Sequence, residues 1–169
     1  MTRRLTAILG TLAFLAVPGF IAGLAPYWIS GGSLRRPLLG LGAFRYLGGV
    51  LIGLGVAGLL ECFARFALKG LGTPTPGFLP QQLVVSGFYR RVRNPMYVAV
   101  LAIILGQALL LGSVALLEYG AFVWLMFHLF VLLYEEPTLR GAFGSDYEAF
   151  RAAVPRWIPR LTPWRGPDG

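Results

Sequence analysis

The chain has 169 residues, of which 56% are hydrophobic and only 13% are charged, and its mean hydropathy is +0.68. A soluble domain carries about a quarter charged residues, so the composition excludes an ordinary soluble protein and predicts a single all-α integral membrane domain over residues 1–169. The formal charge of +8 comes from short basic clusters between apolar stretches. That pattern is typical of membrane topology and not of a nucleic-acid-binding domain.

Four apolar segments are long enough to be membrane-spanning helices, each of which needs about 17–25 residues. They lie at about 5–29, 46–68, 95–111 and 114–134. Arg3 and Arg4 precede the first segment as in a signal peptide, but the apolar stretch is too long and lacks a clear small-residue cleavage site, so a retained span is expected. Only Gly112 and Ser113 separate the last two segments, which predicts a tight antiparallel hairpin.

Lys and Arg residues are distributed unevenly on the two sides of these segments. Of the fifteen, three (Arg35, Arg36 and Arg45) fall outside if the N-terminus is inside, and the other twelve fall in the cytoplasm. This asymmetry predicts that both termini are cytoplasmic. Two cytoplasmic segments then remain, the loop 70–94 and the tail 135–169. The hairpin places Asn94 and Glu135 at the same end, side by side.

The stretch RRVRNPMY (90–97) leads into the third apolar segment. Asn94 is a good N-cap and Pro95 suits a first helical turn, so a plain helix start with arginines bound to headgroups explains the stretch. A ligand site is the alternative, because the N–H groups and positive dipole end of a helix N-terminus suit a carboxylate or phosphate. Tyr89 and Tyr97 would then add aromatic surface and hydroxyl groups.

Glu135 and Glu136 follow the fourth segment, at a C-terminal helix end where the dipole disfavours negative charge. An ordinary explanation is that Pro137 starts a new helix and Glu136 lies favourably before it. However, ionisable groups at a membrane edge are candidates for function. A carboxylate pair that faces a basic loop is a candidate cation site.

The remaining tail is predicted to lie at the membrane surface. Residues at helical spacing (Leu139, Phe143, Tyr147, Phe150 and Val154) predict an amphipathic helix on the bilayer surface. Trp157 and Trp164 are expected to be interfacial aromatics. The one histidine, His128, and the one cysteine, Cys62, lie inside apolar segments, and we expect a hydrogen-bonding side chain and a packed thiol, with no disulfide framework.

Two blocks, LVVSGFYRRVRNPMYVA (83–99) and EEPTLRGAFGSDYEAFRAAVPRWIP (135–159), resemble the isoprenylcysteine carboxyl methyltransferase family. The wider group includes phospholipid methyltransferases and many bacterial members of unknown substrate. The resemblance covers about residues 72–159, with both blocks in the right order and spacing. It implies S-adenosylmethionine as methyl donor, held in a cytoplasm-facing pocket closed by the loop, the hairpin and the tail. We expect a multi-pass protein of a prokaryotic cell membrane.

The same resemblance implies the residues of the cofactor site. They are Gln81, Gln82, Leu83, Val84, Tyr89, Asn94, Pro95, Met96, Tyr97, Glu135 and Glu136. The donor carries a sulfonium, an ammonium and a carboxylate, so Glu135 or Glu136 would suit the ammonium and the helix start at Asn94 would suit the carboxylate. Asn94, Glu135 and Arg140 are the candidates for positioning the reactants, and no metal site is expected.

The sequence departs from the family pattern at two positions. Asn94 stands where the family usually has the histidine of His-Pro-x-Tyr, and because Asn does not titrate near neutral pH, it excludes a general base there. The eukaryotic enzymes have an arginine for the substrate carboxylate four residues before Glu135, and here that position is Val131. This weakens a prenylated cysteine as the substrate, although Arg140 is a candidate replacement.

These features predict a methyltransferase that acts by in-line displacement on a lipophilic or small carboxyl, thiol or amine acceptor entering from the bilayer. One alternative is an NADPH-dependent reductase of the sterol-reductase type, whose acidic pair is usually followed by a cysteine and Lys-Tyr-Gly, both missing here. The other is a non-enzymatic scaffold whose motifs are only interface anchors. A glycine cluster at 48, 49, 53, 55 and 58 permits close helix packing, within the chain or between chains, so the oligomeric state stays open.

Overall fold

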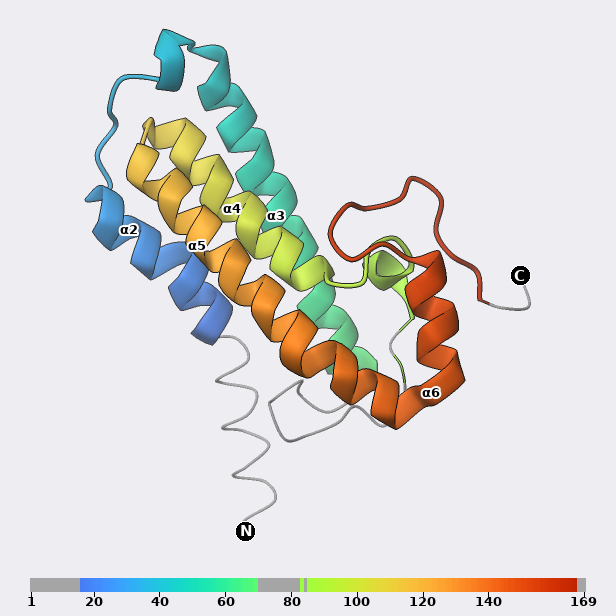
Figure 1. The fold of residues 1–169 in the computed structure, drawn as a ribbon. Coiled ribbons are helices and arrows are strands. Elements are labelled where there is room, and N and C mark those ends of the chain that lie inside the picture. The colour runs from blue at the N-terminus through green and yellow to red at the C-terminus, as the bar shows by residue number, and fades with distance from the viewer. Residues whose placement is uncertain (1–15, 70–82, 84, 167–169) are drawn as a thin grey trace.

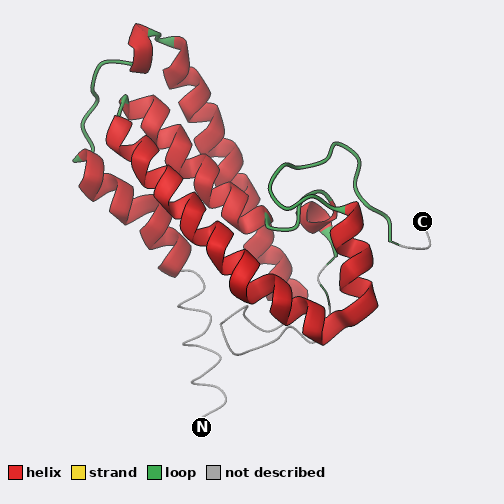
Figure 2. Ribbon diagram, in the orientation of Figure 1, coloured by secondary structure: helices red, strands yellow, loops and turns green. Residues whose placement is uncertain are grey.

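The computed structural model describes residues 16–69, 83 and 85–166, and these residues form helices and loops with no strand (Figures 1 and 2). Two helical stretches, Ala43–Arg65 and Val114–Ala153, are long and apolar enough to cross a membrane, and Ala16–Ser30 and Pro95–Leu111 are shorter apolar helices. The prediction of an all-helical membrane protein is therefore confirmed by the helical content of the described residues and by these apolar helices. Gln81, Gln82, Val84 and the start of the first predicted segment lie outside the described residues.

The first described helical stretch leads into a loop that covers one end of the bundle. It contains a π-turn, η1 (Phe20–Leu24), and α2 (Ala25–Ser30), and it ends at Gly31 in the left-handed conformation that glycine favours. The following loop contains a short helix, η2 (Leu38–Gly40). Its Arg35 N–H donates a 2.9 Å hydrogen bond to the Leu111 carbonyl, which ties the loop to the end of the third apolar segment.

The helices α3 (Ala43–Lys69) and α4 (Pro95–Leu111) pack closely through glycines. A methyl group added at Gly48 would lie 2.6 Å from the Gly106 carbonyl oxygen, and one added at Gly55 would lie 2.8 Å from a carbonyl oxygen of α4. Similar additions at Gly49 and Gly53 would meet nothing within 4 Å. Close packing within the chain therefore accounts for two glycines of the cluster, while two others face away from α4.

The turn between α4 and α5 (Val114–Phe130) consists of two residues. Gly112 has φ +69° and its N–H donates to the Ala108 carbonyl, and Ser113 then begins α5 from an extended conformation. The two helices thus run side by side (Figure 1). Their contact, together with the first helical stretch, forms a core of Ala22, Val100, Ile103, Ile104 and Val123.

The α5 helix runs directly into the tail without a loop. A π-turn, η4 (Val131–Glu135), joins α5 to α6 (Glu136–Ala153), and Pro137 lies in the first turn of α6, where its missing N–H costs nothing. The predicted tail helix is present, but it is bent. Gly144 has φ +49° and ψ −121°, so the chain changes direction there (Figure 1), which a residue without Cβ allows.

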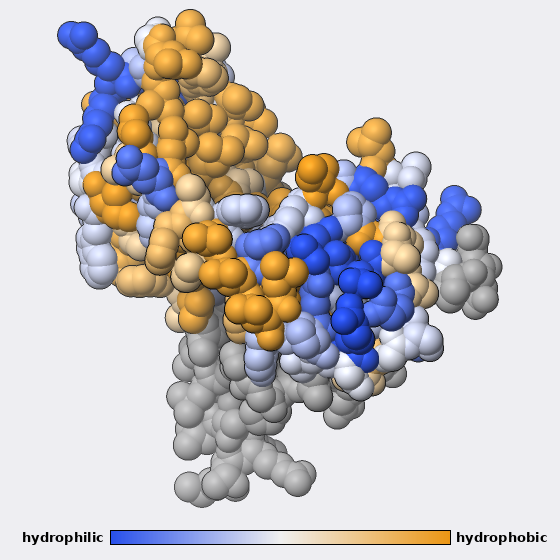
Figure 3. All heavy atoms as spheres, in the orientation of Figure 1, coloured by the Kyte–Doolittle hydropathy of each residue, from blue (hydrophilic) through white to orange (hydrophobic). Residues whose placement is uncertain are grey.

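The second part of α6 packs back onto the loop that precedes α4, and together they form a lobe at one end of the bundle. Tyr147, Phe150 and Val154 form its core, and Leu83, Val85, Leu139, Phe143 and Trp164 pack around them. Three residues of the predicted stripe are thus buried within the lobe, and Leu139, Phe143 and Trp164 are partly buried against them. Hydrophilic side chains gather on this lobe, whereas the bundle surface is mostly apolar (Figure 3).

Candidate functional site

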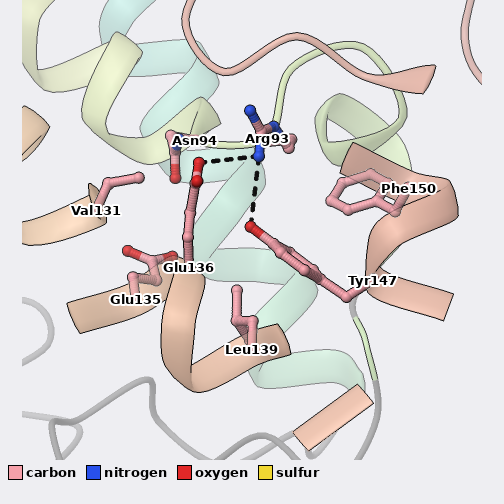
Figure 4. Close-up of a pocket in the computed structure, with 8 residues that line it drawn as sticks. All are labelled: Arg93, Asn94, Val131, Glu135, Glu136, Leu139, Tyr147 and Phe150. Carbon is pink, nitrogen blue, oxygen red and sulfur yellow. Dashed lines mark hydrogen bonds and ion pairs between the residues drawn. The ribbon is translucent and has the colours of Figure 1, made fainter. Parts of the chain in front are cut away.

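The two blocks of the sequence pattern meet in a cleft between the start of α4, the η4–α6 junction and the second part of α6 (Figure 4). Its lining residues are Arg93, Asn94, Val131, Glu135, Glu136, Leu139, Tyr147 and Phe150. It encloses about 230 Å³ of space, part of which is open to solvent. Apolar walls and a few convergent polar side chains share this lining, which makes the cleft a candidate ligand site.

Glu136 is held by two arginines from different segments. Arg156 binds both of its oxygens, Nε to Oε1 at 2.6 Å and Nη2 to Oε2 at 3.0 Å, and Arg93 Nη1 binds Oε1 at 2.9 Å. Only 8% of the Glu136 side chain and 10% of the Arg93 side chain are exposed. Burial alone would raise the pKa of Glu136, but the Arg156 hydrogen bond and the charges of both arginines outweigh it, so the pKa lies below its ordinary value.

Glu135 has a different environment, although it is the neighbouring residue. Its Oε2 accepts a 3.0 Å hydrogen bond from the Tyr97 hydroxyl, and among the described residues its Oε1 accepts none. Tyr97 is itself fixed by stacking on Phe127, with ring centroids 4.5 Å apart. Glu135 lies just beyond the apolar stretch that ends at Tyr134; burial raises the pKa of its carboxyl, the Tyr97 hydrogen bond opposes this, and Glu136 adds to the rise. It is therefore a fixed carboxylate with one oxygen available.

The start of α4 forms the facing wall of the cleft. Asn94 is at the N-cap and Pro95 follows in the first turn, as the sequence predicts. The Asn94 side chain does not cap the helix; its Nδ2 donates to the Arg156 carbonyl at 3.2 Å, and the residue is only 7% exposed. The α4 N-terminus thus keeps its free N–H groups and its positive dipole end near the cleft.

The tail closes the lobe by pairing with the segment before α4. Arg93 N–H donates to the Pro155 carbonyl at 2.9 Å, Arg160 N–H donates to the Arg91 carbonyl at 2.9 Å, and Trp164 N–H donates to the Arg90 carbonyl at 2.8 Å. These bonds place Arg156 over Glu136. The cleft is therefore assembled from segments that lie far apart in the sequence.

A second anchor holds the same segment to α3. Gly87, at the start of η3 (Gly87–Arg90), has φ +58°, and an added methyl group would overlap the side chains of Glu61 and Arg65, which form an ion pair on α3. The turn that carries Tyr89 therefore rests directly on α3. Burial, and then the nearby Cys62 and Glu135 side chains, raise the pKa of the Tyr89 hydroxyl.

The structure brings together only some of the predicted site residues. Asn94, Glu135 and Glu136 line the cleft and Tyr97 contacts one of them, whereas the other described candidates (Leu83, Tyr89, Pro95 and Met96) lie around the cleft without lining it. Arg140 pairs with Glu148 at 2.6 Å, and half of its side chain is exposed, so it lies away from the cleft. Within the described part of the chain, no group of three His, Cys, Asp or Glu could hold a metal.

Three polar residues in or beside the cleft are not predicted by the sequence: Arg93 and Tyr147, which line it, and Arg156, which pairs with Glu136. Arg93 Nη1 donates to the Tyr147 hydroxyl at 3.4 Å as well as to Glu136, and Tyr147 is 2% exposed. Burial, followed by the charge of Glu136, raises the pKa of Tyr147. The excess of arginine around an acidic pair is the signal in the sequence that points to this arrangement.

His128 accepts a 3.1 Å hydrogen bond at Nδ1 from Trp157 Nε1 and stacks on Trp124 at a ring-centroid distance of 5.1 Å. It is thus a hydrogen-bonding residue, as expected, and its partner comes from the tail. Cys62 is fully buried, in agreement with a packed thiol.

The fold and the site define an all-helical membrane protein with a polar cleft at one end of an apolar bundle. The chain belongs to the phospholipid methyltransferase family, whose sequence profile matches residues 44–146. A Schizosaccharomyces pombe protein, Protein-S-isoprenylcysteine O-methyltransferase, is 38% identical over 80 residues. The match covers 47% of this chain and 34% of that protein, so it spans about a third of the relative's length. No solved structure matches the chain.

Proposed function

We propose that the protein is a membrane methyltransferase that uses S-adenosylmethionine and methylates a lipophilic or small carboxyl, thiol or amine acceptor. The observation that carries this proposal is the half-buried Glu135 carboxylate, with one oxygen fixed by Tyr97 and the other available. Membership of the phospholipid methyltransferase family and the name of the matched relative support the reaction class.

The residues of the cleft fit the polar groups of such a donor. Glu135 suits the ammonium group, because its Oε1 accepts no hydrogen bond among the described residues, and the N–H groups in the first turn of α4 suit the carboxylate. Glu136 does not suit the ammonium, since both of its oxygens are paired with arginines. Gln81, Gln82 and Val84 remain proposed contacts on the basis of the sequence resemblance alone.

The cleft also offers a suitable medium for methyl transfer. S-adenosylmethionine supplies an electrophilic methyl group on a sulfonium. Val131, Leu139 and Phe150 form apolar walls beside the carboxylate, and such walls exclude water. In-line displacement by an anionic nucleophile annihilates charge, so a dry cleft with fixed partners favours it through positioning and desolvation.

The proposed topology has four membrane spans, near residues 5–29, 46–68, 95–111 and 114–134, within one membrane domain. Both termini, the loop 70–94 and the tail 135–169 then lie in the cytoplasm, with twelve of fifteen Lys and Arg residues on that side. A prokaryotic cell membrane is the proposed location. The acceptor would enter from the bilayer and the donor from the cytoplasm.

Calorimetry on the full chain in nanodiscs tests the proposal. S-adenosylmethionine and NADPH are titrated separately into the wild type, Glu135→Gln and Glu118→Gln. Glu118 is a matched control because it is an exposed glutamate on α5, the helix that leads to Glu135, near the opposite end of the bundle. We expect S-adenosylmethionine alone to bind to the wild type and the control, and to bind much more weakly to Glu135→Gln.

Other results would overturn the proposal. Binding of NADPH without S-adenosylmethionine would place the protein in the reductase class. Binding of neither ligand, in a sample whose unfolding is cooperative, would leave the scaffold alternative. Equal loss of donor affinity in both variants would contradict the assignment of Glu135 while leaving the reaction class intact.

A further inference from the structure

The tail loop, residues 154–166, carries two aliphatic side chains that the described protein leaves uncovered. Ile158 is 78% exposed and Leu161 is 91% exposed. Apolar atoms project from the otherwise hydrophilic lobe in Figure 3, where Figure 1 draws this loop. Single exposed apolar residues are common on proteins, so exposure alone does not identify what covers them. Three further features of the tail loop identify the covering surface: its backbone hydrogen bonds, its depth along the bundle and its charge.

Part of the tail-loop backbone is hydrogen-bonded within the protein or lacks a donor. The prolines at 155, 159 and 163 have no N–H group. The carbonyl oxygens of Pro155, Arg156, Leu161 and Trp164 accept hydrogen bonds, two of them from arginine side chains. Irregular backbone is not tolerated in hydrocarbon unless its polar groups are satisfied. The tail loop therefore fits the headgroup boundary, where water reaches the remaining polar groups, and not the hydrocarbon interior.

The loop also reaches back along the apolar part of α5. Trp157, next to Ile158, donates a 3.1 Å hydrogen bond to His128. His128 precedes Glu135 by seven residues on the same helical path, which is about 10 Å at 1.5 Å per residue. Interfacial segments bury their apolar side chains about 5–10 Å into the headgroup and acyl boundary. The tail loop thus lies at the depth of that boundary.

The charges around the two aliphatic side chains distinguish a lipid surface from an apolar protein partner. The arginines of the tail loop and of the segment paired with it are Arg90, Arg91, Arg93, Arg156, Arg160 and Arg165. Glu136 pairs with Arg93 and Arg156, and the remaining four have no carboxylate partner among the described residues. Such an excess of cations on the segments that carry or adjoin exposed aliphatic groups complements anionic headgroups above acyl chains.

We propose that Ile158 and Leu161 insert into the cytoplasmic leaflet of an anionic bilayer and anchor the tail beside α5. The tail loop is then a membrane-anchoring loop. Hydrogen bonds within the protein hold its conformation, and the Trp157–His128 hydrogen bond fixes its depth. This anchor also keeps Arg156 over Glu136. It does not depend on the proposed methyl transfer.

The experiment places a bimane fluorophore on single cysteines at position 158, 161 or 146 in full-length Cys62→Ala protein in nanodiscs with anionic lipid. The variants are Ile158→Cys, Leu161→Cys and Asp146→Cys, the last being an exposed polar position on α6. The Cys62→Ala protein without an added cysteine gives the labelling background, because Cys62 is the only cysteine of the sequence. Quenching by lipids with a nitroxide near the headgroup is compared with quenching by aqueous iodide.

We expect lipid quenching and loss of iodide quenching at 158 and 161, and the reverse at 146. Iodide quenching at 158 and 161 equal to that at 146 would show that the loop faces water and would overturn the proposal. Protection from both quenchers would also overturn it, because a protein surface would then cover the loop. Tryptophan replacements at 158 and 161, tested with brominated lipids against the wild-type signal, keep the question decidable if a labelled variant does not fold.

Discussion

Replacing Glu136 with glutamine is expected to destabilise the lobe. It should leave Glu135, the proposed partner of the methyl donor's ammonium group, in place. Glu136 accepts three hydrogen bonds from Arg93 and Arg156, and its side chain is 8% exposed. Removing one partner of a buried ion pair costs about 3–5 kcal/mol. Because the Arg156 side chain is 25% exposed and glutamine keeps one acceptor oxygen, we expect a loss of about 2–3 kcal/mol in the free energy of unfolding.

Glu135→Gln is the matched control for this prediction. Glutamine still accepts the Tyr97 hydrogen bond, so the free energy of unfolding should change by less than about 1 kcal/mol. The affinity for S-adenosylmethionine should respond in the opposite order, with the larger loss in Glu135→Gln. A hydrogen bond to a charged group contributes about 1.5–3 kcal/mol, so Glu135→Gln should weaken S-adenosylmethionine binding about 10- to 100-fold.

Denaturant titration in bicelles gives the unfolding free energies, and calorimetry gives the donor affinities. Equal destabilisation of the two variants would contradict this prediction, because the arginine pair would then not distinguish the two glutamates. A Glu136→Gln variant that keeps full stability but loses donor binding would also contradict it, since Glu136 would then be the carboxylate that binds the donor.

The remaining predictions concern helix packing, the Tyr97 hydroxyl and pH. Gly48→Ala should lower the free energy of unfolding by about 1–3 kcal/mol through overpacking against α4, whereas Gly49→Ala, which meets nothing within 4 Å, should be neutral or slightly stabilising in the same titration. Tyr97→Phe keeps the ring but removes the bond to Glu135, so calorimetry should show donor affinity lowered by up to about tenfold. Since the folded-state pKa of Glu136 lies below its ordinary value of 4.5, its stabilisation should be complete above that pH and lost as pH falls through the folded-state pKa. The stability difference between wild type and Glu136→Gln, measured against pH, should therefore shrink only on the acidic side.

The sequence was most informative where local chemistry decides structure. The helix α4 begins and ends where the apolar pattern predicts, because Pro95 suits its first turn and Gly112 allows the left-handed turn that ends it. Each of these signals acts within a few residues. The meeting of the two blocks at one end follows from the shortness of the turn, and the Tyr97–Glu135 hydrogen bond is its direct consequence.

The different environments of Glu135 and Glu136 could not be predicted in the same way. The two residues are chemically identical neighbours, and adjacent positions on a helix point about 100° apart. Which one meets the arginines depends on the π-turn η4, which alters the helical phase immediately before them, and on Arg156, which the tail brings back from twenty residues away. The direction change at Gly144 makes that return feasible. Long-range pairing of this kind leaves no periodic pattern in the sequence.

The charges of the cleft constrain the acceptor that the proposed reaction could use. Arg93 and Arg156 are balanced by Glu135 and Glu136, so these four side chains are formally neutral together. Val131, which is 1% exposed, adds no cation. A bound S-adenosylmethionine would bring one net positive charge into this neutral cleft. An anionic acceptor would then be neutralised by the donor itself, whereas an amine would enter as a second uncompensated cation, at a desolvation cost of several kcal/mol, and would have to lose a proton before its lone pair could attack the methyl group. Carboxylates and thiolates should therefore be methylated in preference to amines, and raising the pH from 7 to 9 should increase thiol turnover far more than carboxylate turnover, because the carboxylate is already ionised at pH 7. Equal pH dependence for both acceptor classes would contradict this account of the cleft.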